Sequence, residues 1–134
     1  MQDRGEATYL LAWDGDQPCG RATVFHRSKY EQVRDVLGDV PELNGLEATP
    51  RGLGIGSRLI AAAEERATAL GAPLIGLAVE HGNADARRLY ERLGYVDWGY
   101  GDVVDRWSER DGTGTVVREH ADLCSYLVKD LTAR

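Results

Sequence analysis

The stretch ATPRGLGIGSRLIAAAEERA, residues 48–67, places glycine at positions 52, 54 and 56, directly before an alanine-rich run. Over residues 57–70 the apolar side chains recur every three or four positions, which predicts a helix with one buried face, ended by Gly71 and Pro73. A glycine-rich turn that leads into a helix presents main-chain N–H groups without helical partners at the positive end of the helix dipole. The stretch therefore predicts an anion site, with a tight turn against a sheet as the alternative.

Two widespread phosphate loops do not match this stretch. A dinucleotide loop G-x-G-x-x-G that began at Gly52 would need glycine at position 57, where the chain has Ser57. A P-loop needs Gly-Lys followed by Ser or Thr, and the stretch contains no lysine. The anion site is therefore of another kind.

Strand and helix patterns alternate along the rest of the chain. Gly45 lies inside a strand pattern and marks a bulge or a close approach. The predicted order is a mixed α/β (α+β) sheet flanked by helices, in one domain over residues 1–134. The predicted strands are 6–14, 20–26, 42–48, 74–79 and two runs within 95–107 and 115–131. The first two are joined as a hairpin through 15–18, and the last two are separated by a connection at 108–114. Short helices are predicted at 28–38 and 84–93.

The composition narrows the class of partner. The net charge of −6 argues against nucleic acid and mildly favours a cationic or amine-bearing partner. There is no apolar run near 18 residues, and the first residues lack the order of a signal peptide, which predicts a cytoplasmic protein with no membrane partner. The two cysteines and three histidines show no ligand spacing, so no metal is expected.

Two segments together resemble the GNAT superfamily of N-acetyltransferases. Residues 51–56, RGLGIG, are similar to the family's acetyl-coenzyme A motif R-G-x-G-I-G. Residues 83–95, NADARRLYERLGY, are similar to its motif N-x-x-A-x-x-L-Y-x-x-x-G-F/Y. The resemblance implies a mostly antiparallel sheet, acetyl-CoA as co-substrate, and acetyl transfer to the primary amine of a small molecule or peptide. A non-catalytic acyl-CoA-binding or regulatory module with a degenerate acceptor site is the alternative.

The resemblance also implies which residues hold the coenzyme. Main-chain amides at residues 53–57 would bind the diphosphate, with added charge from Arg51, and the strand at 46–48 would offer backbone groups to the pantetheine arm. Asn83 would hydrogen-bond the same arm, unless it only caps a helix. The coenzyme residues are Leu46, Glu47, Ala48, Arg51, Gly52, Leu53, Gly54, Ile55, Gly56, Ser57, Asn83 and Tyr90.

The reaction needs a neutral amine and a protonated leaving group. An unperturbed lysine-like amine costs roughly 4 to 5 kcal/mol to deprotonate at pH 7. Glu42 lies where the family's strand glutamate lies and is the candidate base, with Glu47 as the alternative; either is otherwise a solvated strand residue. Tyr90, whose ordinary pKa lies above that of a thiol, would protonate the departing thiolate, unless it is simply a core tyrosine.

The sequence departs from the family pattern in two places. Family members begin with a strand and two helices, whereas this sequence starts at the hairpin, and the loop between Ala48 and Gly52 is two residues shorter. The acceptor pocket is therefore expected to be open, completed by a second subunit, or absent. A bare strand edge at this end predicts a homodimer.

Overall fold

The computed structural model describes residues 7–48 and 54–132. No helix in these two ranges is long and apolar enough to cross a membrane. The elements are β1 (Ala7–Asp14), β2 (Gln17–Phe25), α1 (Glu31–Leu37), β3 (Glu42–Ala48), α2 (Ile55–Ala69), β4 (Leu74–Glu80), α3 (Ala84–Arg92), β5 (Val96–Asp97), β6 (Val103–Arg110) and β7 (Val116–Asp130).

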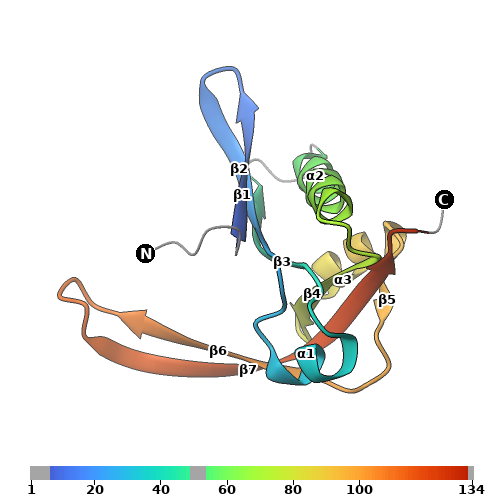
Figure 1. Ribbon diagram of the computed structural model, residues 1–134. Coiled ribbons are helices and arrows are strands. Elements are labelled where there is room, and N and C mark those ends of the chain that lie inside the picture. The colour runs from blue at the N-terminus through green and yellow to red at the C-terminus, as the bar shows by residue number, and fades with distance from the viewer. Residues whose placement is uncertain (1–6, 49–53, 133–134) are drawn as a thin grey trace.

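The strands form one mixed sheet in the order β1-β2-β3-β4-β7-β5, and β6 pairs with β7 (Figure 1). Among the described strands only β3 and β4 run parallel, and every other pair is antiparallel. The predicted fold class is confirmed.

The helices divide between the two faces of the sheet. On one face, α2 and α3 cover a core that includes Leu43, Ile75 and Leu77. On the other face, α1 covers a smaller core around Val33, together with Tyr126 of β7. The molecule is thus three layers thick, and β3 and β4 lie in its middle layer.

Strands β3 and β4 pair over only two rungs. Glu42 pairs with Gly76 and Leu43 with Leu77, and beyond these rungs the two strands separate. We call this separation the fork. Gly45, just past the closed end of the fork, has a φ of 61°, and the register between β2 and β3 shifts beside it. The bulge predicted at this glycine is confirmed.

Several element boundaries differ from the sequence-based expectation. Strand β2 begins at Gln17, inside the turn expected at 15–18, and α1 begins at Glu31 rather than at residue 28. Helix α2 begins at Ile55 rather than at residue 57, because Gly54 takes the left-handed conformation and turns the chain into the helix two residues earlier. Strand β6 continues to Arg110, where residues 108–114 were expected to form the connection. The turn is tighter because the Asp111 carboxylate accepts hydrogen bonds from Thr113 and Thr115. Figure 1 shows the resulting long β6–β7 hairpin projecting from the body.

Candidate active site

The start of α2 presents unpaired backbone donors. Gly54 is the N-cap residue, with a φ of 75° and a ψ of 8°, and it contributes no side-chain cap. The first backbone hydrogen bond of the helix runs from the Arg58 N–H to the Gly54 carbonyl at 3.1 Å. The N–H groups of Ile55, Gly56 and Ser57 therefore precede the helical ladder and are available to an anion.

The predicted coenzyme residues Arg51, Gly52 and Leu53 lie outside the described residues.

Gly56 is not required by packing against the residues that the structure describes. Among them, a Cβ added at Gly56 would meet only the Leu89 Cδ2 atom, at an ordinary contact distance of 3.8 Å. Ile55 beside it is 4% exposed and fixes the helix start against the core. A bound group can therefore approach the backbone at Gly56, and the Leu89 contact places α3 against this end of α2.

The open half of β3 offers backbone groups on one edge. Residues 44, 47 and 48 pair with β2 on the other edge, while beyond the fork's closed end the edge toward β4 pairs with no strand that the structure describes. Leu46 and Ala48 pack against the core of the α2 face. An extended, amide-bearing ligand arm can add to such an edge as a strand does.

Glu47 points away from that core into solvent. Its carboxylate accepts hydrogen bonds from the Arg21 guanidinium, with one N···O distance of 2.9 Å. The hydrogen bonds from Arg21 and its charge hold the pKa of Glu47 below its ordinary value. Glu47 is therefore solvated and paired with Arg21, and its role as a base stays a prediction.

Asn83 caps α3. Its Oδ1 accepts a hydrogen bond from the Ala86 N–H at 3.2 Å, so the capping role is observed. The residue is exposed, and its side-chain nitrogen has no hydrogen-bond partner within residues 7–48 and 54–132. The cap therefore leaves two N–H donors free for a ligand.

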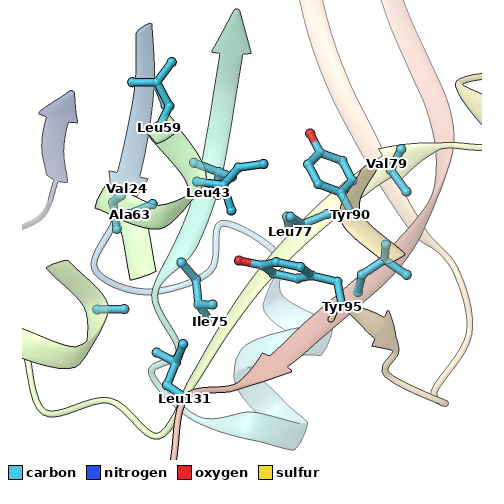
Figure 2. Close-up of a cluster of buried hydrophobic side chains, with 14 of the residues drawn as sticks. Val24, Leu43, Leu59, Ala63, Ile75, Leu77, Val79, Tyr90, Tyr95 and Leu131 are labelled. Atoms are coloured by element: carbon cyan, nitrogen blue, oxygen red, sulfur yellow. The ribbon is translucent and has the colours of Figure 1, made fainter. Parts of the chain in front are cut away.

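Tyr90 projects from α3 into the core of the α2 face. It is 9% exposed and lies in the same cluster as Leu77 and Val79 of β4 (Figure 2). Its ring meets Tyr95 edge-on, with centroids 6.1 Å apart. Burial raises the pKa of Tyr90, so the phenol is protonated at neutral pH. No hydrogen bond from its hydroxyl is found in the described part of the chain.

Glu42 is the largest departure from expectation. The sequence allows either a base or a solvated strand residue at this position, and the solvated interpretation is wrong because Glu42 is 0% exposed. Its carboxylate accepts hydrogen bonds from the hydroxyls of Ser28 and Tyr126, the amide of Asn44 and the backbone N–H of Lys29. Its role as a base stays a prediction.

Sequence reasoning missed Ser28 and Tyr126 altogether. Both are buried, and both donate to Glu42 from segments 14 and 84 residues away. Gly76, inside an apolar strand, is a signal that could have been used, since a strand glycine marks close approach by another group. A Cβ at Gly76 would collide with the ring of Tyr126.

The structure places the α2 start, the free edge of β3 and the buried phenol of Tyr90 on the α2 face of the sheet, and Asn83 caps the helix that carries Tyr90. Together they offer an anion site, a strand-like edge and a proton donor on the α2 face, with a carboxylate sealed on the α1 face. This arrangement suits an elongated ligand that carries a phosphate group at one end and amides along its length.

Comparisons with known proteins identify the family. The acetyltransferase (GNAT) family matches residues 1–95. A mycothiol acetyltransferase of Geodermatophilus obscurus is 33% identical over 90 residues, which cover 67% of this chain and 29% of that protein. The chain therefore spans less than a third of the length of this relative.

Solved structures share the fold over nearly the whole chain. A nourseothricin acetyltransferase is 25% identical with a TM-score of 0.66, and the match covers 98% of this chain and 69% of that one. An aminoglycoside 6'-N-acetyltransferase complexed with coenzyme A is 18% identical with a TM-score of 0.65, covering 98% and 76%. With its family match over most of its length, this chain belongs to the GNAT family of acetyltransferases.

Proposed function

We propose that this protein binds acetyl-CoA at the α2 start and in the fork, and transfers the acetyl group to a primary amine. The observation that carries the proposal is the donor-rich, cap-free start of α2, set against α3 beside the open edge of β3. The coenzyme A bound by the aminoglycoside acetyltransferase supports it.

The residues present fit the coenzyme. The amides of residues 55–57 would bind the diphosphate, and Arg51, Gly52 and Leu53 complete the motif in the sequence. The free edge of β3 and the Asn83 amide would hold the pantetheine arm. Acetyl-CoA supplies an acyl group that is activated as a thioester.

The chemistry is a direct attack. The amine nitrogen bonds to the acetyl carbon, the carbon–sulfur bond breaks, the amine loses a proton and the thiolate gains one. Tyr90 would supply the proton to sulfur, because its phenol is buried, protonated and carried by the helix that touches the α2 start. Holding the amine against the thioester would contribute the larger share of the rate enhancement, because fixed geometry can lower the activation barrier by roughly 7 to 11 kcal/mol.

The acceptor is a small-molecule or peptide amine. The net charge of −6 favours the approach of cations. Acetyltransferases named for aminoglycosides, and one named for the alanine of a ribosomal protein, share this fold. Neither acceptor is assigned to this chain, since the fold hosts both.

Thiol release from acetyl-CoA over a panel of amines tests the function. Activity on at least one amine, and a drop of about 100-fold or more in kcat for Tyr90→Phe, are expected. Unchanged turnover in that variant would remove Tyr90 as the acid. Binding of acetyl-CoA without turnover on any amine would favour the alternative, a non-catalytic acyl-CoA-binding module.

A homodimer through the edge of β1 is also proposed. Strand β1 is the edge of the sheet, and one of its faces carries the exposed apolar side chains Leu11 and Trp13. An exposed apolar edge strand is prone to pair with another strand. Light scattering should give twice the chain mass, and Trp13→Lys should give the monomer. A stable monomer at micromolar concentration in the unmodified protein would exclude this dimer.

A further inference from the structure

Glu42 lies at the closed end of the fork, on the face away from the proposed coenzyme site. It forms the first of the two rungs between β3 and β4, and Leu43 forms the second. Successive side chains of a strand alternate between faces, so Leu43 enters the α2 core while Glu42 enters the α1 side. The carboxylate is thus buried beside the point where the two strands separate.

All acceptor positions of this carboxylate are used. Oε1 accepts from Ser28 Oγ at 2.5 Å and from Tyr126 Oη at 2.8 Å. Oε2 accepts from Asn44 Nδ2 at 2.9 Å and from the Lys29 N–H at 3.3 Å. An ionised carboxylate is an acceptor only, with about four lone-pair sites. Four donors therefore satisfy it, and no site is left for the proton of an amine.

We call β3 and β4 the two arms of the fork. Two of the donors to Glu42 come from β3 and from β7, the strand that pairs with β4. Asn44 is the first residue of β3 beyond the paired rungs, and Tyr126 of β7 pairs with Ala78, the first residue of β4 beyond them. Glu42 itself belongs to β3, so the hydrogen bond that it accepts from Tyr126 joins β3 to the β4–β7 pair, and the one from Asn44 holds the first β3 side chain beyond the paired rungs.

Tyr126 reaches Glu42 by passing over Gly76. The atoms nearest to a Cβ built at Gly76 are the hydroxyl and ring carbons of Tyr126. The phenol is 0% exposed, and its burial, followed by the charge of Glu42, raises the pKa of Tyr126. Tyr126 therefore stays a hydrogen-bond donor throughout the neutral range.

We propose that Glu42 is a positioning residue, which fixes the separation of β3 and β4 and thereby the fit of acetyl-CoA, and that it is not the base. The proposal rests on the proposed function, because it concerns the coenzyme site of that reaction. Loss of the carboxylate, or of one donor, should let the arms of the fork move relative to each other. The coenzyme, which must touch β3 and α2 together, should then bind less tightly.

The experiment compares Glu42→Gln and Tyr126→Phe with the unmodified protein. The measurements are the Kd for acetyl-CoA, kcat with a saturating amine, and the pH profile of kcat/KM. We expect the Kd to rise about 10-fold or more in Glu42→Gln and several-fold in Tyr126→Phe, with the shape of the pH profile unchanged. Tyr126→Phe keeps the Glu42 carboxylate, so this variant tests the proposal if Glu42→Gln does not fold.

Glu64→Gln and Tyr95→Phe are matched controls. Tyr95 donates to Glu64 in α2, about 15 Å of helix beyond Gly54. These variants should lose stability without a change in the Kd for acetyl-CoA. Equal increases in Kd in the controls would mean general destabilisation and would overturn the proposal.

A base role gives a different result. If Glu42→Gln lost about 100-fold or more in kcat and the acidic limb of the pH profile, with the Kd unchanged, Glu42 would be the base and the proposal would be wrong. An unchanged Kd in Tyr126→Phe would also overturn it. If the unmodified protein bound no acetyl-CoA, the proposed function would fail first, and this role with it.

Discussion

Two tyrosine–glutamate pairs lie on opposite faces of the same sheet and have different environments. On the α1 face, Tyr126 donates to Glu42 at 2.8 Å. On the α2 face, Tyr95 donates to Glu64 at 2.9 Å. Glu64 also forms an ion pair with Lys129 at 3.0 Å, and its side chain is 19% exposed in an open hollow between α2 and the end of β7. Glu42 is sealed and has no ion pair within the described ranges.

The difference shows how each charge is compensated. Glu64 has a cation beside it and its side chain is partly exposed to solvent, so the loss of either neighbour should have a modest cost. Glu42 depends on neutral donors from three separate segments, and a buried charge is tolerated only while such donors are in place. A site of this kind holds its neighbours in one arrangement, and Glu42 lies where β3 and β4 separate.

Truncation of the two glutamates should give the largest contrast. Glu42→Ala removes the acceptor for four donors in a sealed volume, and we expect it to lower the free energy of unfolding by about 3 to 5 kcal/mol. Glu64→Ala should cost about 1 kcal/mol, since Glu64 and Lys129 are both partly exposed to solvent. Urea unfolding monitored by circular dichroism measures both. Equal losses would show that the two environments are equivalent.

A methyl group at position 76 tests the packing of Tyr126 over β4. Gly76→Ala should displace the phenol from Glu42 and cost about 1 to 3 kcal/mol. Gly82→Ala is the matched control, because a Cβ at Gly82 meets nothing within 4 Å. If thermal unfolding gave the same midpoint for both variants, Tyr126 would not lie over Gly76 as described.

Alkaline pH should destabilise both pairs alike. Burial is the first cause that raises the pKa of Tyr126 and of Tyr95, so the folded state retains protons that the unfolded state loses near pH 10. This stability is fully present below pH 10 and is lost as the pH rises above it, by up to about 1.4 kcal/mol per pH unit for each tyrosine.

Each single Tyr→Phe variant removes one such group. Above pH 10, the slope of the free energy of unfolding against pH should therefore become less steep by the contribution of about one proton. Urea midpoints measured between pH 9 and 11 give the slope. A slope unchanged by Tyr126→Phe would mean that this phenol ionises in the folded protein as easily as in the unfolded one.

The smallest expected difference between the two pairs is in how salt changes the stability cost of a substitution. The Lys129 ion pair is partly exposed, so Lys129→Met should cost no more than about 1 kcal/mol, and less at 1 M NaCl. The cost of Tyr126→Phe should not change with salt, because no ion pair of Glu42 is involved. Urea midpoints at low and high salt measure the stability cost of both substitutions. A cost of Tyr126→Phe that changed with salt would reveal a charge near Glu42.

Much of the fold could be predicted because its signals are local. The alternate glycines before a periodic apolar stripe predicted α2, the run at 74–79 predicted β4, and Gly45 predicted the bulge. The start of α2 was misplaced because the left-handed conformation of Gly54 cannot be read from the letter G alone. The end of β6 was misplaced because the Asp111 turn depends on side-chain hydrogen bonds.

The candidate site could be predicted only in part. Its backbone components follow from two short motifs, and Asn83 and Tyr90 lie on α3 as the second motif implies. The environment of Glu42 could not be foreseen, since its donors Ser28 and Tyr126 come from segments that only the folded sheet brings together. Local patterns locate a backbone donor, whereas burial of a charge is decided by long-range packing.

Calorimetric titration of acetyl-CoA into the unmodified protein and into Gly56→Val tests the central claim most directly. Packing within residues 7–48 and 54–132 leaves space at Gly56, so the variant should fold while its side chain enters the volume assigned to the diphosphate. We predict a saturable one-to-one heat for the unmodified protein and an affinity at least about tenfold lower for Gly56→Val. No heat with the unmodified protein, or equal affinity in the variant, would contradict a coenzyme site at the start of α2.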